Sequence, residues 1–225
     1  MSDLSNWAMR PIPDLKFVHG RYVIVEPAVF SKYTNDLFDV IGGHENDDLW
    51  SHVAIGPWET APLFGQAMEI HAKNDGWITY LFRDRDNADL LGMASYMRNR
   101  PEQGSTEVGC VVFSKKLQRT PAATEAMYLM AKHVFDDLGY RRYEWKCNNS
   151  NEPSKRAALR LGFTFEGVFR QDMVVKGQNR DTAWYSITDG EWPLVKTAFE
   201  AWLEPENFDT DGGQKRSLAD IRAAL

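Results

Sequence analysis

The 225-residue chain is 43% hydrophobic and 12% aromatic, with a formal net charge of -6 and a pI near 5.4. These values suit one large domain, or one domain with appendages. The acidic balance argues against a nucleic-acid-binding protein, which usually carries a basic patch and a high pI. The N-terminus lacks a charged segment followed by an apolar one, and no apolar run approaches the roughly 18 residues of a membrane span, so we expect a cytoplasmic protein with no membrane partner.

The first half of the chain predicts two helices followed by three strands. Residues 1–20 are expected to be irregular, and a strand at 21–28 follows them. Apolar residues at helical spacing predict helices at 30–41 and 60–73. Three β-rich segments come next, at 77–84, 90–97 and 106–113. A loop is expected at 98–105, before the last of them.

The second half begins with the clearest helix, in which apolar residues recur at i, i+3 and i+4 from Ala123 to Leu138. Gly139 is expected just past its end, where glycine is favoured. The remaining elements are a strand, a short helix, a hairpin, a last helix and a short terminal helix, at 141–147, 151–161, 163–189, 191–203 and 217–225. This order predicts an α+β fold of mixed α/β layers with a mostly antiparallel sheet. We expect the domain at 21–203, between an N-terminal segment (1–20) and a C-terminal arm (204–225).

The cysteines and histidines point to no metal site. Cys110 and Cys147 lie in separate strand-like segments, and the sequence has no CxxC motif. None of the five histidines pairs with another at metal-ligand spacing. We therefore expect buried thiols and no bound metal.

The segment "LQRTPAATEA", 117–126, joins a predicted strand to the clearest helix. Helix N-termini at such places often bind phosphate, because their free N–H groups and the helix dipole attract anions. Loops of that kind usually carry glycine, whereas this one has Pro121. An ordinary helix capped by Thr120 is the alternative interpretation.

Five short motifs in this order, and the spacing on to a sixth segment, give the chain a resemblance to the GNAT acetyltransferases, specifically the RimJ/RimL-like branch, over about residues 17–190. The motifs are "LLGMASY", "EVGCVVF", "QRTPAATEA", "NEPS", "LGF" and "EGVFRQ". The resemblance implies a GNAT-like acyltransferase fold, acetyl-CoA as cosubstrate and an amine as acceptor. GNAT enzymes hold the pyrophosphate with a Q/R-x-x-G-x-G/A loop, and Pro121 stands where this pattern has its first glycine.

The same resemblance implies three sets of cofactor-binding residues. One is the strand end whose backbone pairs with the pantetheine arm: Val111, Val112 and Phe113. A second is the pyrophosphate loop, in which Gln118 stands first and five N–H groups are expected to be free, those of Arg119, Thr120, Ala122, Ala123 and Thr124. The third is Asn151 with Ser154, in "NEPS". Asn151 and Ser154 could equally be cap or turn residues.

The candidate catalytic residues are Glu107, Ser154 and Asp172. Acetyl transfer to an amine needs a base for the amine proton and a donor for the departing thiolate. The resemblance makes Glu107 a candidate base and Ser154 the proton donor, because Leu159 occupies the position where many GNAT enzymes have a tyrosine acid. Asp172 is the weaker candidate base, since Met173 occupies the aligned position and one step along a strand reverses the face.

Three hypotheses follow for the function. The first is an acetyl-CoA-dependent N-acetyltransferase that acts directly on a primary amine, either a protein N-terminus or a small molecule. The second is a CoA-binding module without activity. The third is an oligomeric interaction protein, suggested by its tryptophans Trp7, Trp192 and Trp202 and the C-terminal arm. The connector at 42–58 is acidic and aromatic, which suits either a cationic acceptor or a solvated loop, and a homodimer is left open.

Overall fold

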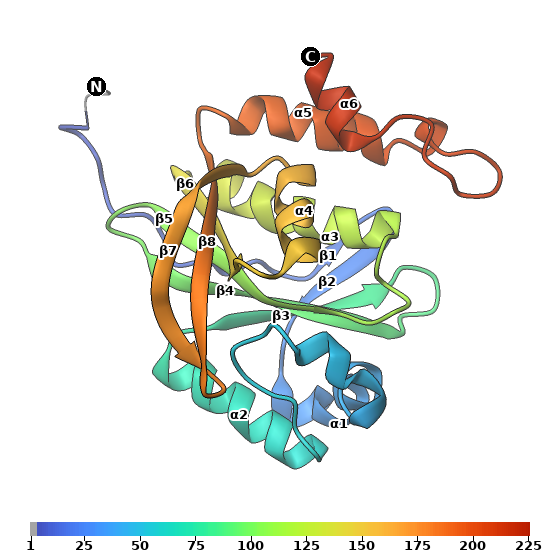
Figure 1. Cartoon of the computed structure of the whole chain (residues 1–225). Coiled ribbons are helices and arrows are strands. Elements are labelled where there is room, and N and C mark those ends of the chain that lie inside the picture. Colours follow the sequence, from blue (N-terminus) through green and yellow to red (C-terminus); the bar gives the residue numbers. More distant parts are fainter. Residues whose placement is uncertain (1–3) are drawn as a thin grey trace.

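The computed structural model describes residues 4–225, and one eight-stranded sheet organises them (Figure 1). The strands lie in the order β1-β2-β3-β4-β5-β6-β8-β7. All neighbours pair antiparallel except β5 and β6, which are parallel. Their bounds are β1 Val18–His19, β2 Val23–Pro27, β3 Ile78–Asp84, β4 Leu90–Arg100, β5 Ser105–Phe113, β6 Arg142–Asn148, β7 Thr164–Val175 and β8 Gln178–Thr188. The expected α+β fold and the interior position of the strand at 106–113 are confirmed.

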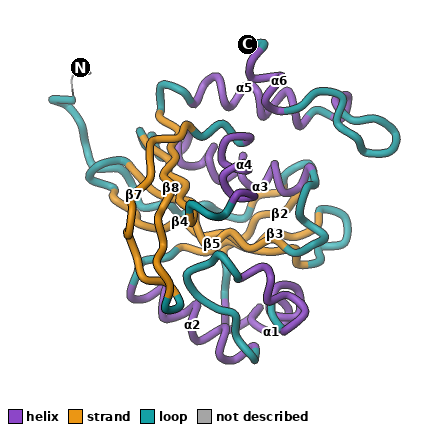
Figure 2. The backbone as a smooth tube through the Cα atoms, in the orientation of Figure 1, coloured by secondary structure: helices purple, strands orange, loops and turns teal. Residues whose placement is uncertain are grey.

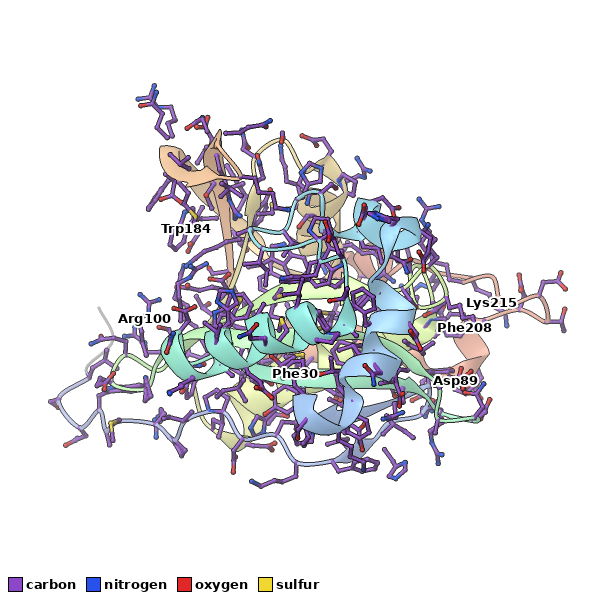
Figure 3. All side chains as sticks on the ribbon, turned by 90° about the horizontal axis from the view of Figure 1, so that it is seen from below. Phe30, Asp89, Arg100, Trp184, Phe208 and Lys215 are labelled. Carbon is purple, nitrogen blue, oxygen red and sulfur yellow. The ribbon has the colours of Figure 1, made fainter. Side chains whose placement is uncertain are left out.

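Helices cover the two faces of this sheet unequally (Figure 2). Four helices lie on the upper face, and their apolar side chains join the larger core; they are α3 Pro121–Lys132, α4 Glu152–Arg160, α5 Trp192–Leu203 and α6 Leu218–Ala223. The lower face carries a smaller core under α1 Phe30–Ile41 and α2 Ala61–Asn74. Seen from below, these two helices leave uncovered the part of the face where Arg100 and Trp184 lie (Figure 3).

Strand β6 shows how the sequence divides its side chains between the two faces. Successive residues of a strand point to opposite sides. Tyr143, Trp145 and Cys147 enter the larger apolar core. The intervening Glu144 and Lys146 point to the lower face, where they form ion pairs.

The structure corrects four sequence-based expectations of local structure. The loop expected at 98–105 is shorter than predicted, because β4 runs to Arg100 and β5 starts at Ser105, which leaves only the turn at 101–104. Residues 18–19 of the segment expected to be irregular pair with β2. The connector after α1 contains a 3-10 helix, His44–Trp50, and the clearest helix ends in a π-helical turn, His133–Asp137. Gly139 follows that turn with φ +65°, as expected.

The C-terminal arm packs on its own domain. Leu218 and Ile221 are buried against the larger core, and Arg222 donates to the backbone carbonyls of Leu159 and Arg160 at the end of α4. Two of the tryptophans that suggested an interaction protein, Trp192 and Trp202, are also buried in this core. They are therefore committed to the fold. Across residues 4–225, no helix has the length and apolar character needed to span a membrane.

Candidate active site

Strands β5 and β6 separate in the middle of the sheet. Their parallel pairing runs from Ser105 opposite Arg142 to Val108 opposite Trp145, and it stops there. A bulge in β5 accompanies the separation, with Cys110 at φ +46°. Bulges of this kind bend a strand and often lie beside functional sites. The rest of β5, residues 109–113, pairs only with β4, so its other edge is left without a strand partner.

The absence of a side chain at Gly109 lets Met97 and Glu107 approach the backbone beside this gap on the lower face. A Cβ there would lie 2.4 Å from Met97 Sδ and 3.0 Å from Glu107 Oε1. Any larger residue would therefore displace both side chains. The expected pantetheine-binding residues Val111, Val112 and Phe113 follow Gly109 along the same unpaired edge, with Val112 packed in the smaller core.

The loop before α3 has a capped helix start and three free N–H groups. Thr120 Oγ1 accepts from the N–H of Ala123 at 3.2 Å, and Thr120 O accepts from that of Thr124 at 3.4 Å. The expectation that both of these N–H groups are free is therefore wrong, because the cap engages them. Those of Arg119, Thr120 and Ala122 have no acceptor among residues 4–225.

Other features of this loop suit an anion. Arg119 is exposed and adopts φ +63°, and Pro121 begins the helix as expected. Gln118 donates its side-chain amide to Phe113 O at 2.9 Å, which ties the loop to the end of β5. The free N–H groups at the positive end of a helix form an anion-binding site without glycine.

Ser154 lies on the upper face, where α4 crosses β6. Asn151 caps α4, and its side-chain oxygen accepts from the N–H of Ser154 at 3.1 Å. The hydroxyl of Ser154 accepts from the indole Nε1–H of Trp145 at 3.0 Å. Because an indole N–H can only donate, this contact leaves the Ser154 proton for an acceptor, and the Cys147 side chain already forms a hydrogen bond with this hydroxyl. The cap interpretation and the proton-donor interpretation are thus compatible.

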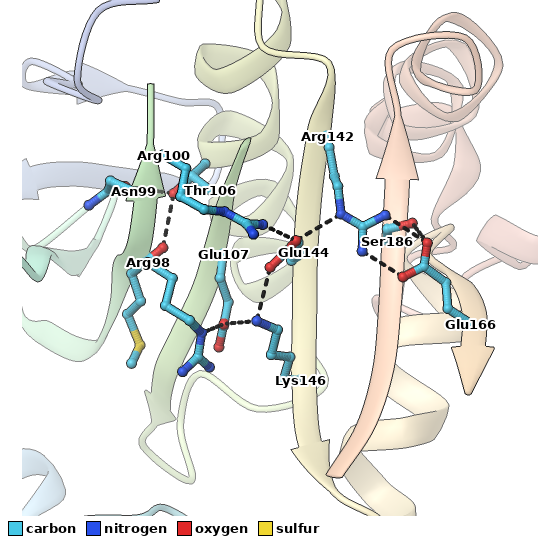
Figure 4. Close-up of polar contacts among 11 residues, drawn as sticks. Arg98, Asn99, Arg100, Thr106, Glu107, Arg142, Glu144, Lys146, Glu166 and Ser186 are labelled. Carbon is cyan, nitrogen blue, oxygen red and sulfur yellow. Dashed lines mark hydrogen bonds and ion pairs between the residues drawn. The ribbon is translucent and has the colours of Figure 1, made fainter. Parts of the chain in front are cut away.

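Glu107 lies on the lower face within a chain of charged side chains (Figure 4). Its side chain is 3% exposed, and its Oε2 receives both Arg98 Nε at 2.5 Å and Lys146 Nζ at 3.2 Å. Lys146 Nζ also lies 3.0 Å from Glu144 Oε2. Glu107 Oε1 takes part in neither ion pair and faces Gly109. Glu107 therefore keeps one oxygen available at the point where the strands separate.

The other candidates are distributed between core and surface. Asp172 is exposed on β7, and Met173 beside it pairs with Arg180 of β8. Tyr185 is buried in the larger core, whereas Trp184 covers Lys146, with Nζ 3.6 Å from the ring centroid. Glu107 and Ser154 thus lie on opposite faces of the sheet beside the same gap, and Asp172 lies on the outer strand of the hairpin.

The cysteines have thiols that remain protonated near neutral pH. Burial raises the pKa of the Cys110 thiol to about 12 and also raises that of Cys147. A thiol in that state is a poor nucleophile. Within residues 4–225, no group of three histidine, cysteine or acidic side chains is arranged to hold a metal ion.

Sequence reasoning missed the partners of the expected site residues. Lys146, Arg98 and Trp145 carry no motif, and only the register of the sheet brings them to Glu107 and Ser154. Charged residues that alternate with apolar ones along a strand, as in "RRYEWKC", were the available signal.

Comparison with known proteins shows the family and the fold. The profile of the acetyltransferase (GNAT) domain family matches residues 35–164, and the chain belongs to this family. The crystal structure of a GCN5-related N-acetyltransferase from Brucella melitensis is 44% identical, covers 98% of this chain and 100% of that one, and superposes with a TM-score of 0.93.

Two Bacillus subtilis proteins are similar over a shorter range. "Uncharacterized N-acetyltransferase YoaA" is 31% identical over 103 residues, which are 46% of this chain. "Putative ribosomal N-acetyltransferase YdaF" is 26% identical over 106 residues, or 47% of this chain. The matches span 58% and 57% of the length of these relatives.

Proposed function

We propose that this protein is an acetyl-CoA-dependent N-acetyltransferase that transfers the acetyl group directly to a primary amine. The gap between β5 and β6 carries the proposal, because it has Glu107 Oε1 on one side and the Ser154 hydroxyl near its other side. Acetyl-CoA supplies an activated thioester. The unpaired edge of β5 suits an extended amide-bearing chain, since it can pair as an added strand.

The loop before α3 is the proposed pyrophosphate site. Its three free N–H groups, at Arg119, Thr120 and Ala122, offer donors to the phosphate oxygens, and the Arg119 guanidinium adds a full positive charge. Asn151, at the start of α4, is the proposed contact for the pantetheine arm. These residues fit the cosubstrate that the fold family implies.

Glu107 is the proposed general base, and Ser154 the proposed acid. In the reaction the amine nitrogen forms a C–N bond to the acyl carbon while the C–S bond breaks. Glu107 Oε1 accepts the proton of the attacking amine, and Ser154 donates a proton to the leaving sulfur. One proton thus passes in net from amine to thiol. Direct transfer fits the protonated thiol of Cys110, since no activated cysteine is available to carry the acyl group.

The test combines binding and turnover. Acetyl-CoA at 100 times its dissociation constant should stabilise the folded protein by about 2.7 kcal/mol. Arg119→Glu should abolish most of the rise in melting temperature, because it reverses the charge beside the free N–H groups. Lys116→Glu makes an equal charge change at an exposed site in the same loop and is the matched control. This variant should retain the rise in melting temperature with acetyl-CoA.

Turnover is then followed by release of the CoA thiol over a panel of peptides and small amines. A protein N-terminus is the first acceptor to try, in view of the name of the Bacillus relative. A thermal shift without thiol release on any amine would favour a CoA-binding module without activity. The absence of any shift at millimolar acetyl-CoA would contradict the proposal.

A further inference from the structure

Arg180 of β8 is a buried cation without a counter-ion. It is 9% exposed, and no carboxylate of residues 4–225 lies within ion-pair distance of it. Its Nε donates to Thr182 Oγ1 at 3.2 Å, and its two terminal nitrogens have no hydrogen-bond partner in the described chain and reach solvent. Burial lowers its pKa, which expresses the cost of removing the charge from water. A buried charge usually requires a partner.

Arg180 lies on the same face as the proposed base. Thr182 pairs with Asn148 and Trp184 with Lys146, so the side chains of these alternate β8 residues share the lower face of the sheet. The contact of Lys146 with the Trp184 ring confirms this side. The titratable groups that act on Arg180 come from four strands and are Cys147, Glu107, Arg98 and Asp172. Arg180 therefore stands in the field of Glu107 while remaining unpaired.

The hairpin that carries Arg180 is anchored across the uncovered face. At its tip, Lys176 Nζ donates to Trp50 O of the 3-10 helix after α1, at 2.9 Å. This contact joins the hairpin to the connector, the two segments that frame this side of the sheet (Figure 1). The hairpin is therefore anchored at its tip, and the Thr182 hydroxyl positions the guanidinium on it.

The carboxylates near Arg180 are already used or exposed. Glu107 receives Arg98 and Lys146, and Glu144 receives Lys146 as well. Asp172 is exposed and forms no ion pair with Arg180. Buried Lys146 and exposed Arg98 thus flank Glu107, and Arg180 adds a third positive charge with free donors.

We propose that Arg180 binds an anionic group, a carboxylate or a phosphate, carried by the amine acceptor. The inference rests on the proposed transfer reaction and names its substrate class. The planar guanidinium offers two parallel donors to such a group. Of the two alternatives for the acidic connector at 42–58, this proposal favours the solvated loop over a site for a cationic acceptor. The surrounding positive charges also favour the neutral, nucleophilic form of that amine.

The first experiment measures anion binding without turnover. The melting temperature is followed against inorganic phosphate at constant ionic strength, with saturating CoA present to block the pyrophosphate loop. The wild type should be stabilised, and Arg180→Met should weaken the apparent phosphate affinity about tenfold to a hundredfold, the range for a charge-assisted hydrogen-bond pair. Arg170→Met removes an exposed arginine of the same hairpin and should leave the affinity unchanged. Equal affinities in wild type and Arg180→Met would overturn the proposal.

The second experiment compares matched acceptors by thiol release. One set pairs amino acids with their amides, and the other pairs peptides that start with Asp or Glu with those that start with Asn or Gln. In one of the two sets, the wild type should have a lower KM for the anionic acceptor (the free amino acid, or the peptide that starts with Asp or Glu) than for its neutral counterpart. Arg180→Met should lose that preference. Arg180→Lys, which keeps the charge, should retain part of it. Transfer with no preference in either set, or one unaffected by Arg180→Met, would overturn the inference while leaving the transferase proposal intact.

If no amine is acetylated, the transferase proposal fails, and the phosphate titration still decides whether Arg180 is an anion site. The two conclusions are thus separable.

Discussion

The two faces of β6 use neighbouring residues in opposite ways. On the upper face Trp145 and Cys147 are buried in a continuous apolar core beneath helices. On the lower face Glu144 and Lys146 are just as inaccessible, yet they are surrounded by charges instead of helices. One strand therefore supplies rigid packing on one side and an ordered ion network on the other.

The comparison indicates a division of tasks across the sheet. The apolar face holds Ser154 through the Trp145 indole, where the proposed leaving group gains its proton. The charged face holds Glu107 through Arg98 and Lys146, where the proposed amine loses its proton. Because the gap between β5 and β6 connects the faces, acid and base need not share one pocket. Four predictions follow, from the largest expected effect to the smallest.

Removal of the base should have the largest effect. Glu107→Gln keeps the shape of the side chain but cannot accept a proton, so kcat should fall by about 10²- to 10⁴-fold, with little change in acetyl-CoA affinity. Asp172→Asn is the matched control among the candidate bases and should cost much less. A larger loss in Asp172→Asn than in Glu107→Gln would transfer the base role to β7.

The stabilisation contributed by the ion pairs of the charged face should decrease in acid, whereas that of the apolar face should not. Paired hydrogen bonds from Arg142 lower the pKa of Glu166. A lowered folded-state pKa stabilises the protein above the ordinary glutamate value and loses that effect as the pH falls through the folded value. Arg142→Met should therefore destabilise the protein by about 1–3 kcal/mol at pH 7 and by less below about pH 4. Arg141→Met, at the exposed neighbour, is the control, and a pH-independent loss would contradict the argument.

The Trp145–Ser154 contact should appear as a coupling. Ser154→Ala should lower kcat about tenfold, and Trp145→Phe by less, since it removes only the N–H that orients the hydroxyl. In the double variant Trp145→Phe should add nothing, because no hydroxyl remains to be oriented. A second measurement compares the affinities for CoA and for desulfo-CoA, which lacks the sulfur. The difference between these two affinities should be smaller in Ser154→Ala than in the wild type. Strictly additive losses would mean that Trp145 only packs.

The helix cap should give the smallest effect. Thr120→Ala removes the acceptor of the Ala123 N–H, which should cost about 1 kcal/mol of stability and a few degrees of melting temperature. Acetyl-CoA should recover part of this loss, since its phosphates can accept the released N–H. Equal losses with and without acetyl-CoA would argue against a phosphate at this helix start.

Local patterns in the sequence predicted most of the elements. The helix at 30–41 is confirmed at both ends, as is the start of α3 at Pro121, because spacing, caps and proline act over a few residues. The missed strand extension at Arg100 depends instead on a partner: β5 continues the pairing across the sheet to Ser105. That partner is close along the chain, but the polar, glycine- and proline-containing segment "RNRPEQGS" is typical of a loop, so the pairing overrides the local composition.

For the site, the sequence by itself determined the motifs: the capped helix after "LQRT", Glu107 in its strand, and Ser154 after "NEP". These motifs depend only on residues that are close neighbours in the sequence. Only the tertiary structure decided which oxygen of Glu107 stays free, how Trp145 meets Ser154, and that Arg180 lies buried without a partner. The physical reason is that burial and charge pairing depend on the register of strands up to tens of residues apart, and register is a property of the whole sheet.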